Sequence, residues 1–366
     1  MSTLTKFELK KIAGNKRTVF LLIGMVLVNL IAFYITSFSY ERAFIPNGRT
    51  NSLKTLTGFA AIRYDREVND KYMGLLTDEK VREMDSDLSA LQRSLKRYSE
   101  DDAACVMNSY VNQQAILENM KNTDGSLKPV SQEYPYPLQL GYSTGWKEMA
   151  GSFSGVVALI LCVVLIVCIS PVFSQEYDWE TDSVLCCTRY GKSRLISAKI
   201  RASFLFLSAV FAAFAVINFC LYGVTYGLDG ADCSIQSSAA YVGSGYSMTF
   251  SQLWLYSLIM GLVGLLCLSA VVLCISAASR GSMTSAICSM VAVLAPLLFD
   301  FSDSYPALQK FLELFPVYLM HASGVLKKVQ TYAGIMQPTV MITVASCGIL
   351  LFLGITFRVF QKHQVA

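Results

Sequence analysis

Residues 149–175, MAGSFSGVVALILCVVLIVCISPVFSQ, form a stretch of 27 residues without an acidic or basic side chain. Glu148 and Glu176 bound it on either side. The hydrocarbon core of a bilayer is about 30 Å thick, and about 20 apolar helical residues cross it. Backbone groups left unpaired in lipid are costly, so this stretch predicts a transmembrane helix. The alternation expected of a membrane-spanning strand is absent.

The rest of the chain repeats this pattern. Hydrophobic residues make up 54% of the 366 residues and charged residues 15%, whereas a soluble domain is about 25% charged. Windows without charge predict six spans, at residues 18–38, 151–172, 202–228, 251–278, 281–299 and 339–357. We therefore expect an all-α integral membrane protein with six transmembrane helices.

Basic residues indicate how these spans are oriented. Six spans place both termini on one side, and cytoplasmic loops are enriched in Lys and Arg. Thirteen such residues lie in the N-terminal stub, the loop after the second span, the turn after the fourth and the C-terminal tail, against three in the opposite short loops. We expect a multi-pass protein of the bacterial cell membrane with cytoplasmic termini. The first span could instead be a signal peptide, but its apolar run is too long for one.

Residues 39–147 are predicted to form a helical domain outside the membrane, because 29 of the 56 charged residues fall between Glu41 and Lys147. Over 77–98, one apolar stripe predicts an amphipathic helix, formed by Val81, Met84, Leu88, Leu91, Leu95 and Tyr98. A second helix is marked by Val106, Tyr110, Leu117 and Met120. Residues 127–147 contain three prolines and predict an extended return. Tyr142 and Trp146 are expected in an aromatic belt. A structural cap, a substrate gate and a docking site for a partner all remain open as roles of this domain.

Several kinds of chemistry are disfavoured. The two histidines lie 42 residues apart, and C-x-x-C is absent, so we expect no catalytic residue and no metal site. A net charge of +4 is too small for a nucleic-acid partner. The predicted spans contain no ionisable residue, which disfavours a proton relay. Gly191-Lys192-Ser193 resembles the end of a P-loop, but Cys186 occupies the first glycine position, so ATP is not expected to bind this chain.

Within the spans, Asn29 and Asn218 are the polar residues of interest. They can form hydrogen bonds between helices, or they can line a translocation path. Of the eleven cysteines, only Cys105 and Cys233 are expected outside, where they can form a disulfide. Cysteines inside the membrane are expected to fill space as small apolar residues.

The loop 173–201 has an unusual charge pattern. Glu176, Asp178, Glu180 and Asp182 precede five basic residues that begin at Arg189. A helix over 176–188 would present its acids and Trp179 to the cytosol, with Val184 and Leu185 facing protein. The basic half can contact anionic head groups. The plainer alternative is a solvated, charged loop.

This loop resembles that of the permease subunits of type-2 ABC exporters, on the residues Glu176, Glu180-Thr181, Val184-Leu185 and 190–195 (YGKSRL). The start Phe7-Glu8-Leu9-Lys10-Lys11 resembles their interfacial elbow helix, and 311–318 (FLELFPVY) resembles their short outer helices. The chain departs from the family pattern at Glu180, where glycine is usual, and in the length of 39–147.

The resemblance implies three parts: 1–38 as interfacial helix and first span, 39–147 as the outer domain, and 148–366 as spans two to six with a coupling loop at 173–201 and an outer loop at 302–337. It also implies a cytosolic ABC ATPase partner, which binds ATP and Mg²⁺, and a second permease copy or paralogue. The ATPase-coupling residues would be Glu176, Trp179, Glu180, Thr181, Leu185 and Arg189. Spans one, two and five would line the path, and Gly151 and Gly155 could allow close helix contact.

The exported substrate stays open, since a peptide, a lipid-like molecule or a drug-like molecule fits equally well. One rival function is a membrane sensor that does not transport and uses 39–147 as its ligand domain. Another is an intramembrane enzyme, which the absence of Asp, Glu and His from the predicted spans disfavours.

Overall fold

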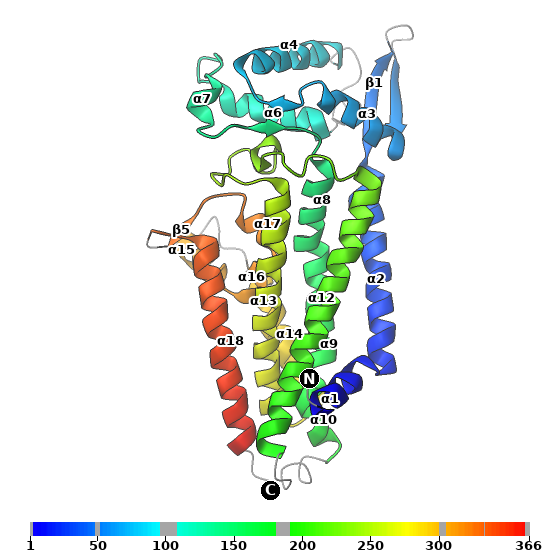
Figure 1. Cartoon of the computed structure of the whole chain (residues 1–366), viewed down its shortest axis with the longest axis vertical. Helices are drawn as coiled ribbons and strands as arrows, with labels where there is room; N and C mark the ends of the chain where they lie inside the picture. The colour runs from blue at the N-terminus through cyan, green and yellow to red at the C-terminus, as the bar shows by residue number, and fades with distance from the viewer. Residues whose placement is uncertain are drawn as a thin grey trace.

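The computed structural model describes residues 3–47, 52–95, 108–180, 191–299, 305–332 and 334–362. It consists of a bundle of long helices with a smaller group of helices and short strands at one end, residues 41–143, which we call the head (Figure 1). We call the opposite end the base. There, α1 (Thr3–Ala13), α10 (Pro171–Asp178) and the end of α18 (Gln337–Lys362) lie (Figure 1).

The bundle agrees with the predicted class of helical membrane protein. Among the described residues, five stretches of helix are long and apolar enough to cross a membrane: Lys16–Tyr40, Thr144–Asp178, Ser193–Tyr226, Phe250–Ala278 and Gln337–Gln361. They correspond to the first, second, third, fourth and sixth predicted spans. Four of them extend past the windows predicted from charge, because the helices continue through charged residues at their ends.

The fifth predicted span is shorter than a full crossing. It forms α14 (Ser282–Leu294) and one turn of 3₁₀ helix, η5 (Ala295–Leu298). Seventeen helical residues extend about 25 Å, which is less than the thickness of the hydrocarbon core. Pro296 lies in the last turn, where the helix tightens and ends.

Short helices follow: α15 (Pro306–Leu312), α16 (Pro316–Met320) and α17 (Ala322–Val325), and the stretch 311–318 extends from the end of the first into the second. They are not a loose outer loop, since α16 and α17 pack against α13 (Phe250–Ala278) with Leu319 and Ala322 fully buried. Gly264 permits this contact, because a Cβ atom there would lie 2.7 Å from the Pro316 carbonyl oxygen. Irregular backbone of this kind is tolerated within a membrane bundle where protein covers it.

The second span is one continuous helix of four segments: α8 (Thr144–Ser152), a π-helical turn η2 (Phe153–Val157), α9 (Ala158–Ile169) and α10. Within it, Phe153 packs edge-to-face against Phe211 of α12 (Ile196–Tyr226) and Trp254 of α13. Gly151 and Gly155 have open space where a Cβ atom would stand. They therefore make no close helix contact within the described part of this chain.

The head contains the two predicted helices, α4 (Asp78–Leu95) and α6 (Asn108–Met120). They pack together around a buried core that includes Val81, Met84, Leu88, Leu117 and Met120. The Thr77 hydroxyl accepts a hydrogen bond from the Lys80 amide at 3.3 Å, so Thr77 caps α4. Leu95, Tyr98 and Val106 lie outside the residues whose side chains are described.

The head also contains strands, which the prediction of a helical domain with an extended return did not include. An antiparallel hairpin of β1 (Arg42–Asn47) and β2 (Ser52–Thr57) leads into α3 (Phe59–Asp70). The predicted extended return contains a helical turn, α7 (Val130–Glu133), and a short strand, β4 (Gln139–Leu140), which pairs with β3 (Gly74–Leu75). The return is therefore extended only in part.

The expected aromatic belt is wrong for Tyr142 and Trp146. Both side chains are buried at the junction between head and bundle. The Trp146 indole N–H donates a hydrogen bond to the Leu228 carbonyl at 3.2 Å. This bond satisfies the buried donor within the protein, so the ring packs against the end of α12 instead of facing a membrane surface.

Candidate functional site: a charge cluster at the base of the bundle

Four ionisable side chains meet where α1, α10 and α12 pack together. They are Glu8 and Lys11 from α1, Glu176 from α10 and Lys199 from α12. The Lys199 ammonium lies 2.6 Å from Glu176 Oε1 and 3.7 Å from Glu8 Oε2, and Lys11 Nζ lies 3.6 Å from Glu176 Oε1. Two acids and two bases balance, so this base cluster carries no net charge.

Lys199 lies at the centre of the base cluster. Its side chain is 1% exposed, and its ammonium also donates a hydrogen bond to the Val172 carbonyl at 2.6 Å. Glu176 is 3% exposed and Glu8 is 5% exposed. Buried charges are tolerated when they are paired and hydrogen-bonded, and removing one partner is strongly destabilising. The base cluster therefore links three helices tightly.

This burial corrects two expectations. The acids of 176–188 were predicted to face the cytosol, yet Glu176 faces inward onto Lys199. The third span was predicted to begin after Arg201, yet the helix that forms it begins at Ser193 and includes the buried Lys199. A signal for this was available, because Lys199 shares a helical face with Ser203, Phe206 and Val210, all of which are buried.

The junction of α9 and α10 is formed around Pro171, which has no N–H and interrupts the helical hydrogen bonds. Serines from neighbouring helices pair with backbone groups on both sides of it. The Ser170 carbonyl accepts hydrogen bonds from the hydroxyls of Ser276 and Ser285, at 2.5 and 2.7 Å. The Ser276 hydroxyl in turn accepts from the amides of Phe173 and Ser174, at 3.1 and 3.2 Å. The start of α10 is thereby tied to α13 and α14.

The end of α10 is tied to the same neighbours. Asp178 Oδ2 accepts a hydrogen bond from the Ser282 amide at 3.0 Å, at the first turn of α14. A carboxylate at a helix N-terminus is favourable because it meets unpaired N–H groups there. α10 therefore connects to α1 and α12 through charges, and to α13 and α14 through hydrogen bonds.

Trp179 follows α10 and projects outward. Its side chain is 55% exposed, and Lys11 Nζ lies 5.4 Å from the centroid of its ring. Glu180 comes next with a φ of +54°, in the left-handed region that glycine adopts most easily. Glycine is usual at this position in the family that the sequence resembles. Thr181, Leu185 and Arg189 lie outside the described residues, as does the rest of the predicted helix up to 188.

The arrangement suits a site that transmits force. A load applied to Trp179 would act on α10, an eight-residue helix. The base cluster would pass it to α1 and α12, and the serine and Asp178 contacts would pass it to α13 and α14. Packed elements with specific polar contacts move as units instead of deforming smoothly.

Asn29 and Asn218 are both buried within the bundle. Asn218 Nδ2 donates to the Phe214 carbonyl at 2.8 Å, while its Oδ1 and the Asn29 Nδ2 have no hydrogen-bond partner among the described residues. Asn29 lies one helical turn before Phe33, and Asn218 lies one helical turn before Tyr222. These two rings pack edge-to-face against each other. A role for them in a translocation path stays a prediction.

A second polar group joins the head to the bundle; we call Glu41, Arg66, Tyr226 and Asp229 the head joint. Arg66 of α3 lies 2.8 Å from the Asp229 carboxylate and donates to the Tyr226 carbonyl at 2.8 Å. The Tyr226 hydroxyl donates to Glu41 Oε1 at 3.0 Å. Gly227 is required here, since it has a φ of +85° and a Cβ atom would lie 2.3 Å from Arg66 Nη2.

The head joint predicts a dependence of stability on pH. Burial, with smaller contributions from the charges of Asp65 and Glu148, raises the pKa of Glu41 from 4.5 to about 7, although the Tyr226 hydrogen bond and Lys147 lower it. The folded protein then holds the Glu41 proton more tightly than the unfolded chain. Protonated Glu41 therefore contributes about 3 kcal/mol to the free energy of unfolding below pH 4.5, and this contribution is lost as the pH rises through 7.

Thermal unfolding in detergent at pH 5 and pH 8.5 measures this effect. Glu41→Gln should unfold at a higher temperature than the parent at pH 8.5 and near the parent's temperature at pH 5. Glu83→Gln, at an exposed position of α4, should match the parent at both pH values. An unchanged pH dependence in Glu41→Gln would contradict the assignment.

The predicted disulfide is untested, because Cys105 lies outside the described residues. Cys233 is buried, and its sulfur lies 2.6 Å from where a Cβ atom of Gly141 would stand. Among the described residues, no three His, Cys, Asp or Glu side chains lie close enough together to hold a metal ion.

Comparison with known proteins adds no family to this description. No protein-family model matches the chain, and no curated protein matches it either. The function proposed below therefore depends on the residues and contacts of the base.

Proposed function

We propose that this chain is the membrane-spanning subunit of an ABC exporter, and that a separate ATPase subunit docks on Trp179 and the residues around it. The observation that carries the proposal is that Trp179 is exposed at the end of α10, a helix that buried charges link to α1 and α12. Interface hot spots are enriched in tryptophan, and an exposed indole over an ammonium suits a docking surface. ATP and Mg²⁺ would bind to the partner, and the chain itself would hold no cofactor.

The backbone at Glu180 supports the same function. The family resembled by 176–195 has glycine at this position, and the chain here adopts a glycine-like conformation with another residue. The contacts of α1 also fit an elbow helix, because Glu8 and Lys11 tie it to α12 and α10. Movement of the docked ATPase would then reach several spans at once.

A second permease copy or paralogue completes the proposed exporter. Gly151 and Gly155 leave open space on the second span, and Leu159 and Val167 of the same stripe are 47% and 49% exposed. Four-residue spacing places these residues on one helical face, which suits close approach of another helix in lipid.

The proposed orientation predicts which surfaces an impermeant thiol reagent reaches. Glu79 in the head and Ser193 at the base are both exposed. In intact cells, Glu79→Cys should gain labelling over the parent protein, while Ser193→Cys should gain it only after permeabilisation. Labelling of Ser193→Cys in sealed cells, with Glu79→Cys protected, would reverse the orientation and remove the ATPase from reach of Trp179.

The function itself is tested by whether an ABC ATPase co-purifies with the chain and is lost when Trp179 is replaced. An intact complex with the Trp179→Ala protein would contradict the proposal.

A further inference from the structure

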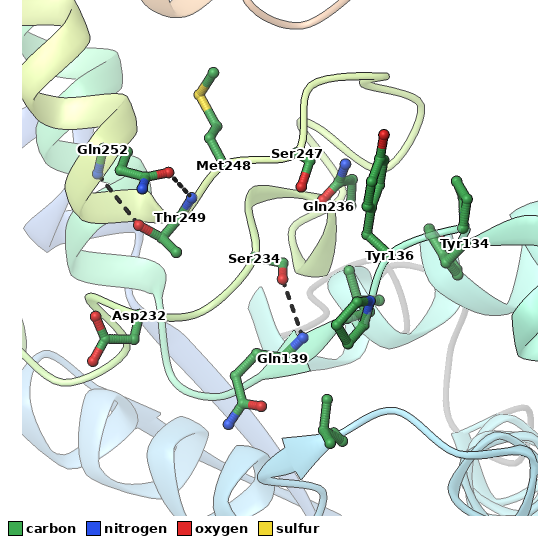
Figure 2. Close-up of a pocket in the computed structure, with 14 residues that line it drawn as sticks. Tyr134, Tyr136, Gln139, Asp232, Ser234, Gln236, Ser247, Met248, Thr249 and Gln252 are labelled. Carbon is green, nitrogen blue, oxygen red and sulfur yellow. Dashed lines mark hydrogen bonds between the residues drawn. The ribbon is translucent and has the colours of Figure 1, made fainter.

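A pocket lies where the head meets the connection between α12 and α13. Its volume is about 520 Å³, within the usual range for sites that bind small ligands. Residues 134–139 of the head form one wall, and residues between 232 and 252 form the other (Figure 2). Because two separate parts of the chain build it, a bound molecule would contact both at once.

The charge of the pocket has one sign. Asp232 lies on its wall, and no lysine, arginine or histidine is among the residues that line it. The exposed Asp232 carboxylate makes no ion pair and no hydrogen bond with the described residues, and Figure 2 shows it at the edge of the pocket, on the side away from Tyr136. An uncompensated carboxylate on a concave surface favours a cation.

The other end of the pocket is aromatic and apolar. Tyr136 is 58% exposed and stands between Pro135 and Pro137. The prolines fix the backbone on both sides of the ring, so little conformational freedom is lost when a ligand packs there. Leu75 is 52% exposed on the same pocket. An exposed tyrosine and leucine beside a cavity provide a surface for an apolar side chain.

Hydrogen bonds hold the pocket in shape. The Gln139 amide donates to the Ser234 hydroxyl at 3.1 Å, and the Ser234 amide donates to the Gln139 carbonyl at 3.1 Å (Figure 2). Thr249 and Gln252 form a capping box at the start of α13. The Gln139 side-chain amide and the Ser247 hydroxyl line the pocket but bond to no described residue, so they can bind backbone groups of a ligand.

We infer that this pocket binds a short peptide segment with a basic side chain next to an apolar one. The basic group would lie at Asp232, the apolar side chain would pack on Tyr136 and Leu75, and the backbone would bond to the unused polar groups. This inference rests on the proposed function, because it makes a basic peptide the substrate class of the exporter on its outer face.

Isothermal titration calorimetry on the chain in phosphatidylcholine nanodiscs tests the inference without any ATPase. Acetyl-Lys-Phe-Leu-amide should bind at least about five-fold more tightly than the Gln or Glu analogues, because only the lysine peptide can pair with Asp232. Asp232→Asn should remove that preference, and Tyr136→Ala should weaken the binding of all three peptides. Asp70→Asn is the matched control, since Asp70 is an exposed carboxylate of the head that does not line the pocket.

Three results would overturn the inference. They are no binding of the lysine peptide up to 1 mM, equal binding of the lysine and glutamate peptides, and phenethylamine binding as tightly as the lysine peptide. Because the assay uses the permease alone, a failure here leaves ATPase docking untouched. A failure of ATPase docking would leave the measured binding standing but would remove the exporter of which the peptide is the substrate.

Discussion

Replacing Lys199 with methionine should destabilise the base of the bundle by about 3–5 kcal/mol, the usual cost of leaving a buried charge without its partner. Methionine fills a similar volume, so the change removes charge with little loss of packing. Glu176 would then keep only Lys11 as a partner, Glu8 would lose the ion pair it makes with Lys199, and the base cluster would carry a net negative charge in a buried place. Differential scanning fluorimetry in detergent measures the loss as a lower unfolding temperature.

Two further variants make this test specific: a double variant that should restore stability, and a control at a nearby arginine. Lys199→Met with Glu8→Gln removes the acid that has lost its partner and leaves Glu176 paired with Lys11, so it should recover part of the lost stability. Arg201→Met removes a basic residue of the same helix that is exposed and bonds only to Ser197 among the described residues, so it should change little. A Lys199→Met protein as stable as Arg201→Met would show that the base cluster does not hold these helices together.

Replacing Trp179 with alanine should weaken ATPase association by about 30-fold and abolish transport. Truncating a tryptophan hot spot costs at least about 2 kcal/mol, and each 1.4 kcal/mol is about a factor of ten in affinity. The side chain is largely exposed, so the folded permease should lose little stability. The measurement is the amount of ATPase that co-purifies, together with a monodisperse detergent peak of the permease.

Variants at Glu180 separate charge from backbone conformation. Glu180→Lys should also weaken ATPase association, because it reverses the charge beside Trp179. Glu180→Gly suits the φ of +54° better and should preserve or raise stability while it removes the carboxylate. Glu83→Lys in the head should leave the ATPase bound. Undiminished ATPase and normal transport in both Trp179→Ala and Glu180→Lys would refute the docking site.

Local signals account for what the sequence predicted correctly. The apolar windows and the stripe of Val81, Met84 and Leu88 depend only on spacing within one helix; five of the six windows form helices long enough to cross a membrane, and the stripe is buried in the head. The hairpin of β1 and β2 was missed, although Asn47-Gly48 is a common signal for a tight turn between strands. The residues on both sides of this pair alternate only weakly between apolar and polar side chains. The Asn-Gly pair alone was therefore not enough to predict a hairpin.

Contacts between distant parts of the chain account for what the sequence could not predict. The prediction placed the end of each span at the first charged residue. Lys199 is nevertheless buried, because Glu8 and Glu176 on other helices form ion pairs with it. Likewise, the role of Ser276 and Ser285 depends on the helix interruption at Pro171, a hundred or more residues earlier. Helical periodicity shows which face Lys199 lies on, but only the packed structure shows which partners neutralise it.

The most direct test of the central claim is a photo-cross-link from position 179. The chain, with p-benzoylphenylalanine in place of Trp179, is irradiated in its native cells, purified under denaturing conditions and analysed by mass spectrometry. We expect a covalent adduct with a protein that carries a P-loop and the other sequence marks of an ABC ATPase, and no such adduct from position 83 in the head. Cross-links from position 179 that contain no ATPase, or an ATPase captured equally from position 83, would contradict the claim.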